Sequence, residues 1–119
     1  MYAAIVDDEP SVRRALSRLL RVYGIEARSY ESARDFLESL NFDRPRCLIL
    51  DAHMPGMTGF ELQTELSRVG PAIPTIVMTG DHDEGNREHA LERGAVTFLL
   101  KPIDPDMLIR AIEHAMKRD

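Results

Sequence analysis

The stretch of sequence that decides the fold is residues 47–59, CLILDAHMPGMTG. It begins as a short apolar run, reaches an aspartate at position 51, turns through Pro55–Gly56 and then enters a helical pattern. A run this short, bounded by turn residues, is typical of a strand that is buried on both faces of a sheet. Asp51 therefore falls at the carboxyl end of a predicted strand, where open parallel sheets place their chemistry.

The composition indicates one globular domain of ordinary size. A chain of 119 residues can bury a core without disulfide or metal staples, and its net charge of -5 argues against binding to a nucleic-acid backbone. The single cysteine, Cys47, opens an apolar strand, so we expect an inert buried thiol in a reducing compartment. We find no signal segment and no apolar run near the roughly 20 residues of a membrane span, so we expect a cytoplasmic protein without a membrane partner.

Strand-like and helix-like segments alternate five times along the chain. The predicted strands cover residues 2–6, 25–29, 47–51, 73–78 and 95–100, and the predicted helices begin near Pro10, Ser32, Thr58, Asp81 and Asp104. Such alternation predicts an α/β fold, a doubly wound five-stranded parallel sheet of the flavodoxin-like (βα)5 type. Right-handed crossovers favour the strand order 2-1-3-4-5, with residues 25–29 at an edge.

The last two predicted helices differ in how much apolar surface they can bury. Residues 81–93 contain Gly85, and Ala90 and Leu91 are nearly their only apolar residues, so we expect the least stable helix of the fold there. The final helix has a capping aspartate, Asp104, and a fuller apolar stripe. The stripe consists of Met107, Leu108, Ala111, Ile112, Ala115 and Met116.

The first predicted helix carries four arginines on its polar face, at positions 13, 14, 18 and 21. A solvated helix face explains them without any partner. A docking surface for an acidic or helical partner is the alternative.

Polar residues follow four of the five predicted strands. Asp7 and Asp8 follow the first strand, Asp51 ends the third, Thr79 follows the fourth and Lys101 follows the fifth. The carboxyl ends of parallel strands share one edge, so these side chains should converge. Crowded carboxylates repel one another unless a proton or a cation intervenes. Oxygen ligands without cysteine favour Mg²⁺ as that cation.

This set of residues suits phosphoryl transfer. Asp51, the central carboxylate, can act as a nucleophile toward phosphorus and form an aspartyl phosphate. Asp8 would coordinate Mg²⁺ directly, and Asp7 would hold a metal-bound water. Lys101 would pair with the phosphoryl group, and the Thr79 hydroxyl could donate to one of its oxygens.

Each of these residues also has an ordinary structural explanation. Acidic residues before a helix are often caps, and an aspartate at a strand end is often a turn residue. A strand-terminal threonine can be β-branched filler, and Lys-Pro is common in loops. Their joint occurrence on successive strand ends is what favours the functional interpretation.

The chain resembles a known family, the receiver domains of two-component response regulators (the CheY-like superfamily). The resemblance covers residues 1–119 as one receiver domain. It rests on residues 6–9 (VDDE), residues 50–59 (LDAHMPGMTG) and residues 78–80 (MTG), and on Phe98 three residues before Lys101-Pro102. The sequence around Asp51 and Thr79 is most similar to that of FixJ-type receivers.

The resemblance implies a reaction and a metal site. Asp51 would accept the phosphoryl group of a phosphohistidine on a histidine kinase, with Mg²⁺ as the required cofactor. The metal would be held by Asp8, Asp51 and the backbone carbonyl of His53. A cis peptide bond is implied between Lys101 and Pro102, and only X-Pro bonds adopt cis at low cost.

The resemblance also implies a switch. Thr79 would move toward the phosphoryl group and Phe98 would turn inward, with ordinary core filler as the alternative for Phe98. The surface of the fourth helix, fifth strand and fifth helix would then change and recruit a partner. We expect a phosphorylation-dependent homodimer through the fourth-helix and fifth-strand part of this surface.

FixJ-type receivers usually precede a helix-turn-helix domain. The resemblance therefore implies control of transcription through a DNA-binding output domain absent from residues 1–119, with DNA contacted only through that domain. A natural single-domain regulator is the alternative.

Two other classes of protein place similar chemistry on a similar sheet. A haloacid-dehalogenase-type phosphatase would turn over substrate. Such an enzyme typically has a second aspartate two residues after the nucleophile, where this chain has His53. A flavodoxin-like cofactor binder needs a Ser, Thr and Gly loop after the first strand, where this chain has Asp7-Asp8-Glu9. We therefore expect a phosphoacceptor domain rather than a turnover enzyme. His53 and Asp81 should flank the entrance to the phosphoryl group, where Asp81 could either repel anionic donors or hold a hydrolytic water.

Overall fold

Five parallel strands form one sheet in the order β2-β1-β3-β4-β5, as the alternating pattern predicted. The computed structural model describes residues 1–82 and 85–117. The strands are β1 (Ala3–Val6), β2 (Ala27–Tyr30), β3 (Cys47–Asp51), β4 (Thr75–Thr79) and β5 (Thr97–Leu100). The helices are α1 (Pro10–Val22), α2 (Ala33–Ser39), α3 (Gly59–Val69), α4 (Gly85–Glu92) and α5 (Pro105–Met116).

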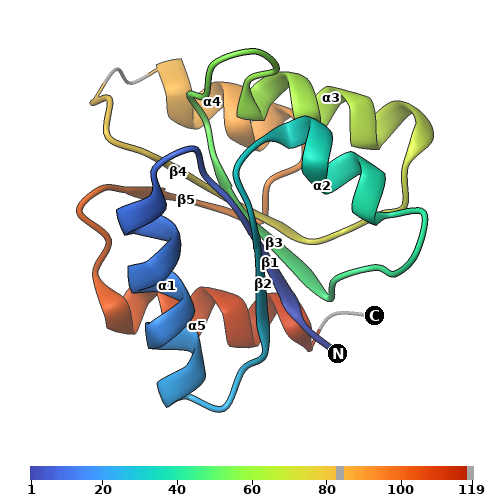
Figure 1. Cartoon of the computed structure of the whole chain (residues 1–119). Helices are drawn as coiled ribbons and strands as arrows, with labels where there is room; N and C mark the ends of the chain where they lie inside the picture. Colours follow the sequence, from blue (N-terminus) through green and yellow to red (C-terminus); the bar gives the residue numbers. More distant parts are fainter. Residues whose placement is uncertain (83–84, 118–119) are drawn as a thin grey trace.

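The sheet lies between two layers of helices, with α1 and α5 on one face and α2, α3 and α4 on the other (Figure 1). Successive strand residues point to opposite faces, so one strand serves both layers. In β3, Ile49 packs toward α1 and α5, while Leu48 and Leu50 pack toward α2 and α3. All five residues of β3 are buried, which confirms the prediction of a strand buried on both faces.

The register of the sheet aligns the carboxyl ends of its neighbouring strands. Val6 of β1 lies opposite Leu50 of β3, so the residues that follow each of them emerge side by side. β1 and β3 are the neighbours between which the strand order reverses. Open parallel sheets bind ligands at this switch point.

Local capping signals in the sequence set the starts of three helices. Thr58 and Glu61 form a reciprocal capping box at the start of α3. The hydroxyl of Ser32 accepts the N–H of Asp35 at the start of α2. The carboxylate of Asp104 accepts two backbone N–H groups at the start of α5.

The structure departs from the predicted elements in α5 and α4. Met107 was predicted to belong to the buried stripe of α5 but is 56% exposed, and Ile109 is buried in its place. Gly85 was predicted to lie inside the fourth helix but is the first residue of α4, and residues 83–84 lie outside the described part of the chain. Of the two apolar residues expected to anchor this helix, Ala90 is buried and Leu91 is exposed.

Membrane-spanning helices require both length and a long apolar stretch. No helix in residues 1–82 and 85–117 meets both requirements.

Candidate functional site

Three carboxylates converge at the carboxyl edge of the sheet. Asp7, Asp8 and Asp51 each offer an oxygen within 4.8 Å of the others. Asp7 is fully buried, Asp51 is 4% exposed and Asp8 is half-buried. The strand ends thus bring together the acidic residues that were predicted to meet there.

The loop after β1 holds Asp7 in place from two sides. Its Oδ1 accepts the backbone N–H of Glu9 at 2.9 Å, and Nη1 of Arg13 donates to its carbonyl oxygen at 2.6 Å. Arg13 is therefore one arginine of the basic α1 face with a structural role, since it ties the first turn of α1 to the acidic loop.

Lys101 reaches into the acidic cluster from the end of β5. Its Nζ lies 2.9 Å from Oδ2 of Asp7, 3.5 Å from Oδ1 of Asp51 and 3.8 Å from Oε1 of Glu9. The side chain of Lys101 is only 17% exposed, so its contacts with the buried Asp7 and Asp51 are shielded from solvent, whereas the contact with the exposed Glu9 is not. The peptide bond between Lys101 and Pro102 is cis.

Burial and charge shift the acidity of the groups in this cluster. Desolvation, followed by the charge of Asp7, raises the pKa of Asp51 to about 6, although Lys101 opposes the shift. For Lys101, burial lowers the pKa, but the hydrogen bond to Asp7 and the charge of Asp51 outweigh it and raise the pKa overall. The carboxylates therefore repel one another more than a single ammonium offsets, and a cation would relieve the remaining repulsion.

Thr79 ends β4 beside this cluster and is fully buried. Its Oγ1 accepts the backbone N–H of Asp81 at 3.0 Å, which ties the hydroxyl to the loop that leads toward α4. A hydroxyl that accepts one hydrogen bond can still donate its own hydrogen to another acceptor. The side chain is therefore positioned between the sheet edge and that loop.

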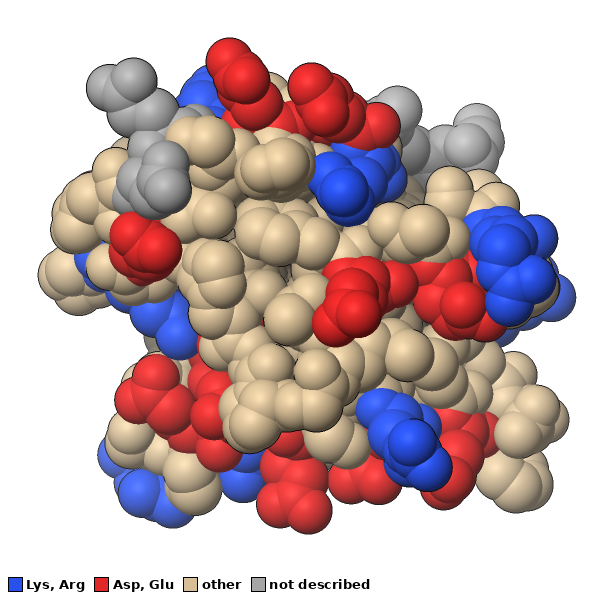
Figure 2. Space-filling model, turned by 90° about the horizontal axis from the view of Figure 1, so that it is seen from above, with Lys and Arg blue, Asp and Glu red and all other residues tan. Residues whose placement is uncertain are grey.

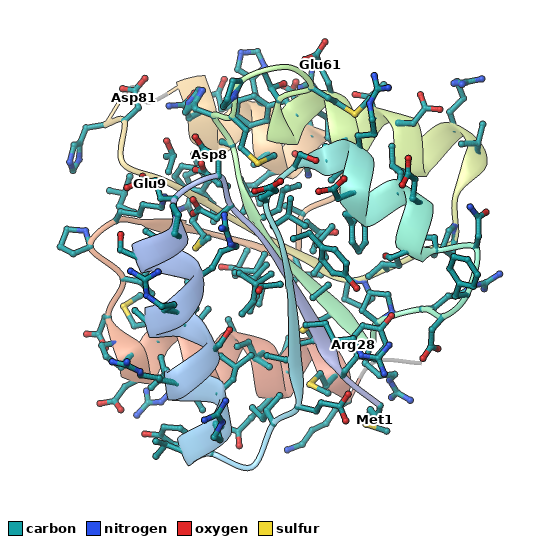
Figure 3. The ribbon with its side chains drawn as sticks, in the orientation of Figure 1. Met1, Asp8, Glu9, Arg28, Glu61 and Asp81 are labelled. Atoms are coloured by element: carbon teal, nitrogen blue, oxygen red, sulfur yellow. The ribbon has the colours of Figure 1, made fainter. Side chains whose placement is uncertain are left out.

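A concave region of about 340 Å³ opens above the cluster. It is lined by Glu9, Asp51, His53, Thr79, Gly80, Asp81 and Lys101. Figure 3 shows Asp8, Glu9 and Asp81 at this end of the sheet, with Arg28 at the opposite end. Acidic side chains are spread over the face seen in Figure 2, and basic side chains lie between them. His53 and Asp81 thus both flank the opening, as predicted.

Phe98 is buried at 8% exposure on the α4 side of the sheet, where it packs with Val77 and Ala90. It also lines a groove of about 680 Å³ beside Leu100 and Met107. In this conformation the Phe98 ring therefore points inward, toward Val77 and Ala90.

Gly59 is a residue of the site that the motif reasoning missed. A Cβ at this position would overlap the backbone oxygen of Asp51 and lie 2.8 Å from Cα of Ala52. The backbone N–H of Gly59 donates to the carbonyl of Ala52 at 3.0 Å. Only glycine lets α3 approach the loop after Asp51 this closely. No local sequence pattern signals this close approach, because it depends on how α3 packs against the loop after Asp51.

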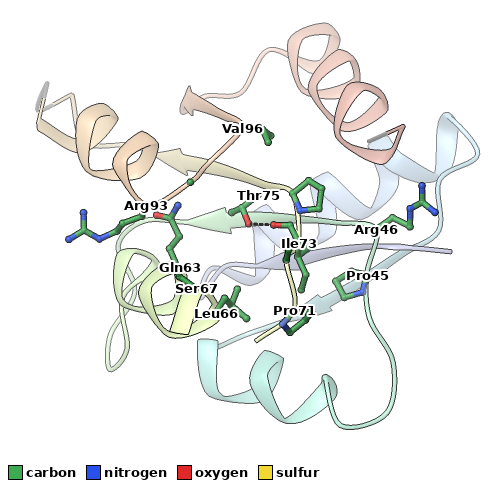
Figure 4. Close-up of a pocket in the computed structure, with 13 residues that line it drawn as sticks. Pro45, Arg46, Gln63, Leu66, Ser67, Pro71, Ile73, Thr75, Arg93 and Val96 are labelled. Atoms are coloured by element: carbon green, nitrogen blue, oxygen red, sulfur yellow. Dashed lines mark hydrogen bonds between the residues drawn. The ribbon is translucent and has the colours of Figure 1, made fainter. Parts of the chain in front are cut away.

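A larger groove of about 530 Å³ lies at the opposite, amino edge of the sheet (Figure 4). Its walls include Pro71 and Ile73 from the loop before β4, and Leu66 from α3. None of the residues that line it is acidic, so it lacks the chemistry of the carboxyl edge.

The single cysteine, Cys47, is buried, as the sequence predicted. Burial raises the pKa of Cys47 to about 12, so its thiol stays protonated and inert. His82, His89 and His114 are exposed.

Comparison with known proteins identifies the class of this fold and site. The sequence profile described as "Response regulator receiver domain" matches residues 3–113. The chain is 41% identical to Nodulation protein W of Bradyrhizobium diazoefficiens, covering 97% of this chain and 51% of that protein. It is 39% identical to the transcriptional regulatory protein FixJ of Rhizobium meliloti, covering 93% of this chain and 54% of that protein. The chain thus spans about half the length of these curated relatives.

Solved structures agree with this assignment. The crystal structure of FixJ-N has a TM-score of 0.91 and 35% identity, and the match covers 100% of this chain and 96% of that one. A response regulator receiver protein from Burkholderia phymatum has a TM-score of 0.87 and 41% identity, with 99% and 96% covered. The chain belongs to the response regulator receiver domain family, which consists of signalling domains.

Proposed function

We propose that this receiver domain accepts a phosphoryl group on Asp51 from a histidine kinase in a Mg²⁺-dependent reaction. The observation that carries the proposal is the convergence of three carboxylates with the Lys101 ammonium at one strand edge. Asp51 is the central member of this set, and the concave region above it leaves room for a donor.

The proposed reaction is a displacement at phosphorus. A carboxylate oxygen of Asp51 attacks the phosphorus of a phosphohistidine, the new O–P bond forms and the P–N bond breaks. The donor imidazole leaves with the electron pair of that bond and takes a proton from solvent. Lys101, 3.5 Å from Asp51, offsets negative charge on the transferring group, and Thr79 donates its hydroxyl hydrogen to a phosphoryl oxygen.

The acidic cluster suits a hard divalent cation. Asp8 and Asp51 would hold Mg²⁺ together with the backbone carbonyl of His53, and Asp7 would act through a coordinated water. The raised pKa of Asp51 supports this assignment, because the cluster carries repulsion that a cation would relieve. When bound, Mg²⁺ supplies charge neutralisation for the phosphoryl oxygens.

The output of the phosphorylated domain would arise at the α4–β5–α5 surface. Thr79 is tied to the loop before α4, and Phe98 packs with Ala90 of α4, so these two residues would transmit the change to that surface. The changed surface would then support a homodimer.

The relatives suggest what such a change would control. FixJ is named as a transcriptional regulatory protein, and its match to this chain covers 54% of its length. We therefore propose a cytoplasmic regulator in which residues 1–119 are the receiver and a separate output domain contacts DNA. The domain would catalyse only its own phosphorylation and dephosphorylation.

Intact-protein mass spectrometry tests the phosphoacceptor directly. The protein is incubated with acetyl phosphate with and without Mg²⁺, beside Asp51→Asn and the control Asp43→Asn, which changes an exposed aspartate. We expect one phosphoryl adduct that requires Mg²⁺, persists in Asp43→Asn and is absent from Asp51→Asn. An adduct that survives in Asp51→Asn contradicts the assignment, and steady phosphate release without an adduct indicates a hydrolase instead.

A further inference from the structure

Phe60, at the start of α3, contacts two different parts of the molecule. Its ring centroid lies 5.7 Å from the imidazole of His53, with the planes at 89°, and 5.6 Å from that of His89, with the planes at 50°. The guanidinium of Arg93 lies 5.8 Å from the same ring. One half-buried ring therefore lies against His53 on one side and against residues 89 and 93 on the other.

On the first side, Phe60 supports a residue of the candidate site. His53 is exposed and lines the opening above Asp51. An exposed imidazole keeps one orientation only if something holds it, and an edge-to-face aromatic contact does so. The ring of Phe60 therefore determines where the His53 side chain stands relative to an incoming donor.

On the second side, Phe60 supports a helix that has few other anchors. Among the described residues of α4, only Asn86 and Ala90 are buried. A hydrogen bond from α3 also holds this helix, since Nε2 of Gln63 donates to the carbonyl of Ala90 at 3.1 Å. Gln63 stands three residues after Phe60, so both side chains lie on the α3 face that meets α4.

The same interface contains a buried polar atom without a partner. Oε1 of Gln63 makes no hydrogen bond with any residue in the described part of the chain. An unsatisfied buried acceptor raises the free energy of the arrangement that contains it. The contact that Gln63 makes between α3 and α4 is therefore less favourable than one in which both polar atoms of its amide are paired.

We propose that Phe60 is a positioning residue that couples His53, at the opening of the phosphorylation site, to α4 through His89 and Arg93. A shift of α4 displaces the ring and with it the His53 imidazole, and a group bound above Asp51 that moves His53 shifts α4 in return. This route runs along the face of α3 that meets α4, and it adjoins the apolar cluster that contains Phe98 and Ala90. The inference rests on the proposed function only in that phosphorylation supplies the bound group.

The first test needs neither phosphoryl donor nor metal. NMR resonances of the His53 ring are recorded for the wild type, for His89→Gln and for the control His114→Gln, which changes an exposed histidine on the opposite face of the sheet. We expect His89→Gln to move the His53 resonances and His114→Gln to leave them in place. Unchanged His53 resonances in His89→Gln would overturn the proposal, and they would do so whether or not Asp51 accepts phosphate.

The second test measures the coupling when the site is occupied. Hydrogen exchange of residues 85–93 is compared before and after addition of Mg²⁺ and beryllofluoride, a phosphoryl mimic. We expect Phe60→Leu to reduce the wild-type change in α4 exchange about twofold or more, and Phe60→Tyr, which keeps the ring, to restore it. An α4 response in Phe60→Leu equal to that of the wild type would contradict the coupling.

The two tests separate failure of the coupling from failure of the proposed function. If beryllofluoride leaves the wild-type exchange around Asp51 unchanged, the proposed function is in error. In that case the resonances of His53 in His89→Gln still decide whether Phe60 joins the two histidines.

Discussion

Asp51 is a buried carboxyl group whose surroundings disfavour its ionised form. Its pKa is raised from 3.8 to about 6, chiefly by desolvation and by the charge of Asp7. As pH rises from about 4 to about 6, the unfolded chain has already lost this proton while the folded chain still binds it. The free energy of unfolding therefore falls through this window, and ionised Asp51 destabilises the metal-free protein above it.

Replacing Asp51 should consequently stabilise the metal-free protein near neutral pH. In chelated buffer near pH 7.5 we expect the free energy of unfolding of Asp51→Asn to exceed that of the wild type by about 1–3 kcal/mol, with little difference near pH 4. Urea unfolding at both pH values measures this. Asp43→Asn is the control, because its surface ion pair with Arg28 contributes little. A gain for Asp51→Asn at pH 4 as large as at pH 7.5 would show that ionisation is not the cause.

Gly59 determines how closely α3 approaches the loop after Asp51. In Gly59→Ala the new methyl group would overlap the backbone oxygen of Asp51, and backbone cannot move aside as a flexible side chain can. We expect a loss of at least about 2 kcal/mol in the free energy of unfolding, measured by urea denaturation. Gly80→Ala is the matched control, since a Cβ there meets nothing within 4 Å. Equal stability of both variants would mean that the approach is not tight.

The residues of the site differ in how far their positions could be predicted from the sequence. Asp7, Asp51 and Lys101 could be placed together because parallel topology alone brings strand ends to one edge. The Gly59 contact and the ring contacts of Phe60 could not be predicted. They depend on the distance and rotation of α3 relative to the sheet, which no local sequence pattern encodes.

Among the helices, α4 should be the least protected from hydrogen exchange. Ala90 is its buried apolar residue and Leu91 is 41% exposed, so this helix gains little from burial. α1 buries Leu16 and Leu20 against the sheet. We expect amides of α4 to exchange roughly a hundredfold faster than those at the centre of α1, measured by native-state exchange. Equal protection in the two helices would contradict the expected weakness of α4.

At the scale of elements, type and order were more predictable than helix orientation. The five-fold alternation, the Thr58 capping box and the Asp104 cap are local signals, and the structure confirms them. The buried face of α5 was predicted one position off, with Met107 exposed and Ile109 buried. A helix with apolar residues at 107, 108 and 109 can rotate either pair inward, and packing against the sheet decides between them.

For the whole molecule, the two helix layers do not leave the same surfaces exposed. The α4–β5–α5 side carries Leu100 at 46% exposure and Met107 at 56%, around a groove of about 680 Å³ that Phe98 also lines. The site and this groove both meet the sheet at β4 and β5, through Thr79 and Phe98. Occupation of the site can therefore alter the groove without unfolding either helix layer.

This geometry predicts that the phosphorylated domain dimerises through the α4–β5–α5 surface. By sedimentation we expect a monomer without phosphoryl donor and a dimer with Mg²⁺ and beryllofluoride, because apolar groups such as Met107 would leave water on contact. Met107→Glu would place a charge in that contact and should raise the dimer dissociation constant about tenfold or more. Phe42→Glu, at a residue 91% exposed and outside this surface, is the control and should dimerise as the wild type does. A monomer in both states, or full dimerisation of Met107→Glu, would move the output to another surface.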